Sequence, residues 1–240
     1  MSKTAKKVKA DTKKETVQKA LTEFMEGGDS KAIAESVIFN TMRILKKVNP
    51  GDCYLENYLG MRKKYGNFLD VYHVLWAIGS RFAPKRILEI GTRTGISMCQ
   101  LLSSYIDTST IERIVCVDPF DEFTSAALVR ANLKYLNLPV EKVEIVETKS
   151  NEYFDAIQHE RSYDLILVDG DHTKEVAAED LESAHELLES SGFLLMDDLS
   201  EAPGECALLD VWTKFGTAHK DEYAFWTSTA GKGVGVGMKL

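Results

Sequence analysis

The chain has 240 residues, of which 44% are hydrophobic, and this is enough to bury one sizeable core without disulfide bridges. Its four cysteines are widely spaced and form no CxxC pair, which argues against a zinc ribbon or a disulfide framework. No apolar run approaches the roughly 20 residues of a membrane span, and the N-terminus lacks the apolar stretch of a signal peptide. We therefore expect a cytoplasmic protein with reduced thiols and no membrane contact.

Charge is unevenly distributed along the chain. The net charge is −8, but residues 1–19 carry seven lysines and two acids, so the rest of the chain carries −13. A basic end of this kind can contact nucleic acid or an anionic surface. Because it contains no aromatic residue, we instead expect residues 1–15 to form a flexible, solvated tail.

Residues 16–82 show a helical pattern and are predicted to form an N-terminal cap. Apolar residues recur at three- and four-residue spacing on both sides of a break at EGGDS, residues 26–30. The Asn-Pro-Gly sequence at 49–51 ends this pattern, and a further helix is expected over residues 68–81.

From residue 83 to residue 240, short β-branched runs alternate with amphipathic stretches. Strands are expected at RILEI (86–90), RIVCVD (113–118), VEIVE (143–147), DLILVD (164–169) and GFLLMD (192–197). Helical patterns separate them at 96–106, 122–136 and 175–189. Strands that are apolar on both faces and alternate with helices predict an α/β domain with a parallel sheet covered on both sides. Residues 222–228 and 234–240 flank a turn and predict a C-terminal β-hairpin.

A loop containing two glycines follows the first predicted strand. In EIGTRTGIS, Glu89 lies at the strand end, and Gly91 and Gly95 precede the next helix. Glycines let the backbone approach a ligand, and a helix N-terminus favours a polar or anionic group. The spacing is GxxxG and lacks the GxGxxG dinucleotide fingerprint, which argues against a nicotinamide cofactor. Asp118 closes the second strand, 27 residues after Gly91, where an acid can accept the hydroxyls of a ribose.

Three aspartates and a histidine follow the fourth and fifth predicted strands. Asp169 closes the fourth strand in DLILVDGDH, and Asp197 and Asp198 close the fifth in GFLLMDDLS. One crossover helix separates these strands, so we expect them to be near neighbours, about 4.8 Å apart if adjacent. Carboxylates held this close repel one another unless a cation neutralises them. Oxygen ligands without cysteine favour Mg²⁺, Mn²⁺ or Ca²⁺ over zinc. His172 follows three residues after Asp169 and can accept a proton near neutral pH.

The sequence LEIGTRTGIS, followed by CVDPF, resembles the cofactor-binding half of class I S-adenosylmethionine-dependent methyltransferases. The resemblance implies a Rossmann-like sheet of seven mostly parallel strands that ends with an antiparallel strand. It also implies S-adenosyl-L-methionine as the cofactor, with its methionine part in the glycine loop, its ribose on Asp118 and its adenine near Ser150. The residues expected at the cofactor are Glu89, Gly91, Thr92, Gly95, Ser97, Asp118, Ser150 and Asp169.

The acidic cluster resembles that of the metal-dependent O-methyltransferases, of both the catechol type and the sugar or macrolide type. This resemblance implies that Asp169, Asp197 and Asp198 hold one divalent ion, Mg²⁺ or else Mn²⁺ or Ca²⁺. Catechol enzymes place a lysine base where this chain has His172, whereas DGDH is similar to the sugar-modifying relatives. We therefore predict methylation of a hydroxyl on a small molecule, a sugar or natural product, with His172 and Asp169 as catalytic residues.

Several polar residues near these positions could have a structural role. Asp171 and Asp180 are expected to be structural, Asp198 could instead cap a helix, and His172 could bond a loop carbonyl. Aromatic side chains of the cap that could cover the acceptor are Tyr54, Tyr58, Tyr72 and His73.

The alternatives to this function are methylation of an amine or a nucleic acid, a non-catalytic binding module, and a nicotinamide oxidoreductase. DGDH differs from the NPPY or DPPY type that flanks base amino groups, which disfavours nucleic acid. Pairing of subunits through the N-terminal helices is expected by analogy alone.

Overall fold

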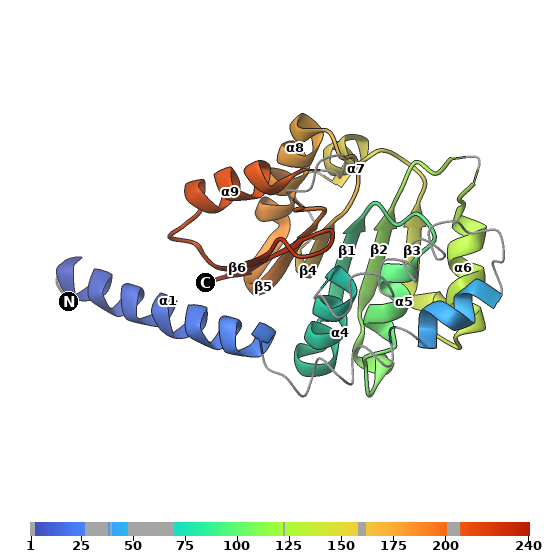
Figure 1. Ribbon diagram of the computed structural model, residues 1–240, viewed down its shortest axis with the longest axis horizontal. Coiled ribbons are helices and arrows are strands. Elements are labelled where there is room, and N and C mark those ends of the chain that lie inside the picture. The colour runs from blue at the N-terminus through green and yellow to red at the C-terminus, as the bar shows by residue number, and fades with distance from the viewer. Residues whose placement is uncertain are drawn as a thin grey trace.

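The computed structural model describes residues 3–26, 38, 40–47, 70–121, 123–157, 162–200 and 207–240. Its strands form one seven-stranded sheet in the order β3-β2-β1-β4-β5-β7-β6 (Figure 1). The strands are β1 (Arg86–Ile90), β2 (Arg113–Val117), β3 (Val143–Val146), β4 (Tyr163–Val168), β5 (Leu188–Asp197), β6 (Tyr223–Ser228) and β7 (Val234–Lys239). The pairs among β1 to β5 are parallel, whereas β7 runs antiparallel to β5 and to β6. The predicted α/β sheet with its antiparallel C-terminal hairpin is confirmed.

Helices cover both faces of the sheet because each central strand is apolar on both sides. The helices are α1 (Lys3–Glu26), α4 (Val71–Phe82), α5 (Ile96–Leu102), α6 (Ala126–Tyr135), α7 (Ser150–Ile157), α8 (Lys174–Leu187) and α9 (Leu209–Ala218), and residues 40–47 are also helical. Ile87 of β1 packs in the core beneath α4, α5 and α6, whereas its neighbour Leu88 packs beneath α7, α8 and α9. None of the described helices is long and apolar enough to cross a bilayer.

Several element boundaries differ from those predicted. β5 begins at Leu188, four residues before the predicted start, because an irregular register beside β4 lets the chain pair before Gly192. The short helices α7 and α9 were not predicted, and α5 ends at Leu102, four residues before the end of the predicted pattern. These are short segments, in which a helical period has too few turns to be distinct.

The first helix crosses the predicted boundary between tail and cap. Residues 3–15 were expected to be a flexible tail, but they form the first half of α1, which is continuous from Lys3 to Glu26. This segment contains no glycine or proline and is rich in Ala, Lys and Glu, which are good helix formers. The expectation of a flexible tail over these residues was therefore wrong. The rest of the division, with a cap over residues 16–82 and a domain over 83–240, stays a prediction, as does the pairing of subunits through N-terminal helices.

The second half of α1 packs against the edge strand β6. The side-chain amide of Gln18 donates to the Phe225 carbonyl, and the Phe225 N–H donates to Gln18 Oε1 at 2.9 Å. One side chain thus satisfies the outward-facing backbone groups of Phe225. Phe24 also packs edge-on against Phe82 of α4, with ring centroids 5.3 Å apart. Covering a sheet edge in this way limits unwanted strand pairing.

The packing of α9 on the hairpin yields a stability prediction. A Cβ atom added at Gly235 of β7 would lie 2.4 Å from the Trp212 indole, which is buried and donates to Thr227 Oγ1 at 2.8 Å. We expect Gly235→Ala to lower the free energy of unfolding by about 1–3 kcal/mol, because the indole cannot move away freely. Urea denaturation measures this.

Gly216→Ala is the matched control, because a Cβ atom at this position in α9 meets Phe225 at 3.8 Å, an ordinary contact. It should leave stability unchanged or raise it by up to about 1 kcal/mol, since alanine favours a helix over glycine. Equal destabilisation by both substitutions would contradict the prediction.

Candidate functional site

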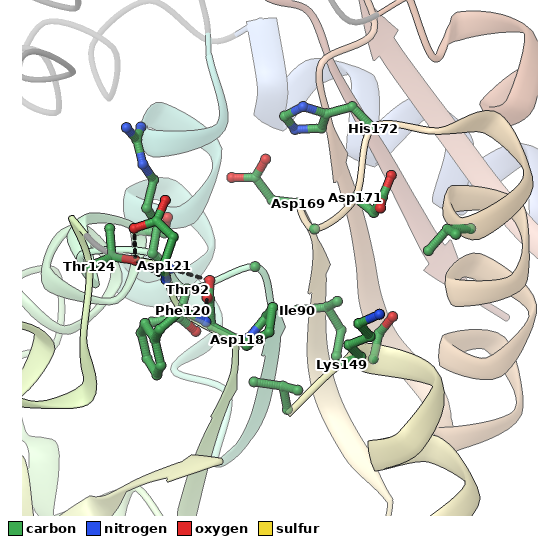
Figure 2. Close-up of a pocket in the computed structure, with 18 of the residues that line it drawn as sticks. Ile90, Thr92, Asp118, Phe120, Asp121, Thr124, Lys149, Asp169, Asp171 and His172 are labelled. Carbon is green, nitrogen blue, oxygen red and sulfur yellow. Dashed lines mark hydrogen bonds between the residues drawn. The ribbon is translucent and has the colours of Figure 1, made fainter. Parts of the chain in front are cut away.

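A cavity of about 540 Å³ opens at the carboxyl edge of the parallel strands. Its walls are the loops after β1, β2, β3 and β4, with Tyr72 of α4 and Lys232 of the β6–β7 turn. Figure 2 shows Thr92, Asp118 and Phe120 on one side and Asp169, Asp171 and His172 on the other. This edge is where open α/β sheets bind ligands, and the cavity is the candidate functional site.

Gly91 allows the loops after β1 and β4 to touch. Its φ is +88°, and a Cβ atom there would lie 1.8 Å from the Asp169 carbonyl oxygen. Gly95 is needed for a different contact. Its φ is +76°, and a Cβ atom there would lie 2.7 Å from the Val129 side chain of α6. Gly91, Thr92 and Ser97 line the cavity, whereas Gly95, predicted at the cofactor, sets the start of α5 and its packing on α6.

Glu89 lies beneath the loop and is fully buried, and it is not among the residues that line the cavity. Burial raises its pKa to about 7, although the nearby hydroxyls of Thr92 and Ser97 act in the opposite direction. Its carboxyl group thus lies beside Thr92 and Ser97, and both of these residues line the cavity. Direct contact of Glu89 with a cofactor stays a prediction.

Asp118 organises the backbone on the β2 side of the cavity. Its Oδ2 accepts the Arg93 N–H at 2.7 Å, and its Oδ1 accepts the Phe120 N–H at 2.6 Å. Arg93 and Phe120 both have φ of +52°, a region that non-glycine residues occupy at a cost of about 1–3 kcal/mol. A carboxylate has about four acceptor positions, so Asp118 can still accept hydroxyl groups of a ligand.

Ser150 begins α7 and lines the cavity below the β4 loop. Its hydroxyl hydrogen-bonds Asp180, a buried residue of α8. Burial raises the pKa of Asp180 to about 6, and the bond from Ser150 opposes that shift. Ser150 is therefore held by α8 at the position where adenine was predicted to bind.

The acidic cluster forms where β4 and β5 end side by side. Asp197 and Asp198 are buried, and Figure 2 shows the Asp169 carboxylate pointing into the cavity. His172 Nε2 lies 3.0 Å from Asp198 Oδ2. One ligand atom each from Asp169, His172 and Asp198 lie within 4.8 Å of one another. The three residues whose ligand atoms converge are thus Asp169, His172 and Asp198, whereas the predicted set was Asp169, Asp197 and Asp198.

Lys232 lies beside the acidic cluster, and the sequence analysis did not name it as a site residue. Its Nζ lies 2.8 Å from Asp198 Oδ1 and 3.5 Å from Asp197 Oδ2. The stretch TAGKG was interpreted only as a hairpin turn. Because Val234 of β7 pairs with Asp197 of β5, the turn before Val234 must lie beside the acids. Knowledge of which strand β7 pairs with would have predicted this lysine.

Burial and the neighbouring charges shift the pKa values of the three aspartates in different directions. Burial, and then the Asp197 charge, raise the pKa of Asp169, and burial also raises that of Asp197. Burial acts to raise the pKa of Asp198 too, but the hydrogen bond with His172 and the charge of Lys232 outweigh it and lower that pKa. The same bond raises the pKa of His172. Asp198 therefore contacts both His172 and Lys232.

The remaining candidates divide between the cavity wall and the core. Asp171 lines the cavity, but its Oδ1 accepts the Thr173 N–H at 2.7 Å. Tyr72 lines the cavity, whereas His73 is buried with its Nδ1 2.7 Å from Asp70 Oδ1. Tyr54 and Tyr58 lie outside the described residues.

Comparison with known proteins identifies a domain around this site. Residues 88–199 match a family model described as a methyltransferase domain. These residues are therefore identified as a methyltransferase domain. The match supports the resemblance to S-adenosylmethionine-dependent methyltransferases seen in the glycine loop and Asp118. The matched segment runs from β1 past the end of β5, so it contains both sides of the cavity.

Solved structures share the fold of this chain at low sequence identity. The SAH-bound Podospora anserina methyltransferase PaMTH1 is 16% identical, with a TM-score of 0.61 over 94% of this chain and 96% of its own. The Bacillus cereus O-methyltransferase in complex with SAH is 16% identical, with a TM-score of 0.60 over 93% and 97%. TomG, the Streptomyces achromogenes O-methyltransferase of tomaymycin synthesis in complex with SAM, is 17% identical, with a TM-score of 0.56 over 70% and 78%. The comparison with curated proteins finds no match.

The buried Glu89 gives the protein a pH-dependent stability. Its pKa of about 7 in the folded protein lies above the ordinary 4.5, so folding disfavours its ionised form. The free energy of unfolding should fall as pH rises from about 4.5 to 7 and then level off. Glu89→Gln lacks this loss, so between pH 5 and pH 8 it should gain up to about 2 kcal/mol relative to the wild type.

Chemical denaturation at several pH values measures this gap. Glu175→Gln on the exposed start of α8 is the control and should run parallel to the wild type. A Glu89→Gln curve that also ran parallel would show that Glu89 does not resist ionisation.

Proposed function

We propose that this protein transfers the methyl group of S-adenosyl-L-methionine to a hydroxyl of a small molecule, a sugar or natural product, with help from a divalent ion. The observation that carries the proposal is the division of one cavity into two sides. The glycine loop and Asp118 form one side, and Asp169 and His172 form the other. A methyl donor and an acceptor held on these two sides would meet between them.

The donor side suits a nucleoside with a charged amino-acid tail. Backbone groups of the loop at Gly91 and Thr92 border the cavity, as does the start of α5 at Ser97. The free acceptor positions of Asp118 suit ribose hydroxyls, and the Ser150 end of the cavity suits the base. The SAM and SAH complexes of the structural relatives support this choice of donor.

The acidic cluster fits a divalent ion. Asp197 Oδ1 is buried and makes no hydrogen bond with any described residue, so a carboxylate oxygen is left for a cation. Asp169 and Asp198 offer hard oxygen ligands that, with a ring nitrogen of His172, lie within 4.8 Å of one another, a group that does not include Asp197. Such ligands favour Mg²⁺, with Mn²⁺ and Ca²⁺ as alternatives. When bound, such an ion would lower the pKa of an acceptor hydroxyl nearby.

Lys232 has a clear role in this proposal. Its ammonium group already neutralises part of the Asp197 and Asp198 charge, so it competes with a divalent ion for the same carboxylates. Lys232 is partly exposed and lies in a turn, so its side chain can withdraw toward the cavity opening. Its charge would then still border the acceptor.

His172 is the proposed base. It is 44% exposed, lies on the cavity wall and is oriented by its bond with Asp198. Its imidazole can take the acceptor proton, while Asp169 orients the hydroxyl. Most of the acceleration comes from placing the two reactants about 3 Å apart, which is worth roughly 7 kcal/mol or more. The O-methyltransferases among the structural relatives support a hydroxyl acceptor.

The donor assignment is tested by binding. S-adenosylhomocysteine should bind the wild type in isothermal titration and raise its melting temperature, whereas NAD should do neither. Asp118→Asn should weaken this binding about tenfold to a hundredfold, because a charged acceptor is lost. Asp107→Asn is the control, since Asp107 also accepts a backbone N–H but lies away from the cavity. Binding of NAD alone would exclude the proposal.

The metal assignment is tested with chelator-treated protein and Mg²⁺. Mg²⁺ should bind the wild type, and Asp169→Asn should weaken it by about tenfold or more because an oxygen ligand is lost. Lys232→Met should bind Mg²⁺ about tenfold more tightly, because the competing ammonium is gone. Lys149→Met, which removes another lysine of the cavity wall, should leave the affinity unchanged. If neither the wild type nor Lys232→Met binds Mg²⁺, the metal assignment is wrong, and Lys232 is the cation that pairs with Asp197 and Asp198.

A further inference from the structure

A second cluster of metal-ligand side chains lies outside the cavity. It consists of His185 near the end of α8, His219 just after α9 and Glu222 just before β6, and we call it the histidine cluster. One ligand atom from each residue lies within 4.8 Å of the others. None of the three lines the methyl-transfer cavity, so the proposed transfer reaction does not account for them.

Both imidazole rings turn one nitrogen toward Glu222. His219 Nδ1 lies 2.9 Å from Glu222 Oε1, and His185 Nε2 lies 3.8 Å from Glu222 Oε2. The two rings lie against each other, with centroids 4.2 Å apart and planes tilted by 41°. Two nitrogens and a carboxylate therefore converge on one point, with the rings splayed around it.

The other nitrogen of each ring has a partner of its own. His219 Nε2 lies 3.0 Å from Glu182 Oε2, and His185 Nδ1 lies 2.9 Å from the Tyr223 hydroxyl. In metal sites a ligating histidine nearly always uses its second nitrogen for such a bond, which fixes the tautomer and the ring orientation. The histidine cluster thus has the outer hydrogen bonds of a metal site as well as the inner ligands.

Burial and charge both suit a borderline divalent ion. The side chains of His185 and His219 are 17% and 15% exposed, whereas that of Glu222 is 52% exposed, so the convergence point is open to solvent on one side. Glu182 and Glu222 supply negative charge, and the Lys239 charge nearby opposes it. The Lys239 ammonium is directed to the carbonyls of His185 and Leu188 and so stays outside the ligand set.

We propose that the histidine cluster binds one Zn²⁺ ion through His185 Nε2, His219 Nδ1 and Glu222, with water as the fourth ligand. Two imidazoles and one carboxylate are a ligand set that zinc accepts, at about 2.0–2.2 Å from each atom. The ion would join the end of α8, the end of α9 and the start of β6. It would stabilise the packing of α9 and the C-terminal hairpin on the rest of the sheet, independently of methyl transfer.

The test uses protein without a histidine tag, treated with chelator and then dialysed. Isothermal titration with Zn²⁺ should show a site with one-to-one stoichiometry at the histidine cluster. Co²⁺ should give visible absorption bands of a tetrahedral complex with nitrogen and oxygen ligands. Zn²⁺ at 100 times its dissociation constant should raise the melting temperature by about 5 °C or more.

Variants separate this site from the acidic cluster. Glu222→Gln and His219→Gln should each abolish the Co²⁺ bands and the thermal shift, and circular dichroism checks that both remain folded. Glu182→Gln should weaken Zn²⁺ binding about tenfold to a hundredfold through the loss of the outer bond. Glu175→Gln, at the far end of α8, should change nothing. The double variant Asp169→Asn with Asp198→Asn should keep the cobalt bands.

Two outcomes would overturn the proposal. The first is the absence of Co²⁺ bands and of any Zn²⁺ shift in the wild type, which would make the cluster an ion-paired group that only links α8, α9 and β6. The second is binding that survives Glu222→Gln and His219→Gln but disappears in the double aspartate variant, which would place the ion in the cavity. Neither outcome bears on the methyl donor or on Mg²⁺, whose tests use separate ligands and variants.

Discussion

The mutual repulsion of carboxylates at one edge of a parallel sheet is the constraint on which the rest of this site depends. β4 and β5 are adjacent and parallel, so Asp169, Asp197 and Asp198 lie near one another at the carboxyl ends of these strands, whatever the conformation of the loops. Burial makes that repulsion costly, because water cannot screen it. Lys232 from the β6–β7 turn and His172 from the β4 loop lie beside these carboxylates, and both contact Asp198. The site thus carries its own cation in Lys232, and a divalent ion would compete with Lys232 for these carboxylates.

Three of the six non-glycine residues with positive φ in the described part of the chain lie at the same edge. Arg93, Phe120 and Asp198 are non-glycine residues with positive φ, and they follow β1, β2 and β5. Asp118 holds Arg93 and Phe120 through their N–H groups, so one carboxylate stabilises two strained turns. Strain held by the surrounding structure is typical of binding sites, where it keeps a loop in the shape that a ligand requires. Gly91 contributes the one close approach that no side chain permits, against the Asp169 carbonyl.

The C-terminal segment connects these features to stability. The hairpin of β6 and β7 brings Lys232 to the acids, and Trp212 of α9 packs over Gly235 of the same hairpin. Gln18 of α1 covers the outer edge at Phe225, and the histidine cluster joins α8, α9 and the start of β6. Any change that loosens the hairpin would therefore alter the charge balance in the cavity. The stability of the outer strands and the chemistry of the inner ones are linked through one turn.

The sequence by itself determined the parallel sheet, its antiparallel hairpin and the positions of Gly91, Asp118 and Asp169 at the carboxyl edge. These follow from local signals, since runs apolar on both faces indicate buried strands, and the residue after such a strand lies at its end. Only the tertiary structure decided that Glu89 is buried beneath the loop, that Gly95 faces Val129, and that Lys232 and His172 share Asp198. It also decided that His185, His219 and Glu222 meet. The physical reason is that each of these contacts joins segments far apart in the chain, and the order and register of the strands, which no local pattern contains, set which segments meet.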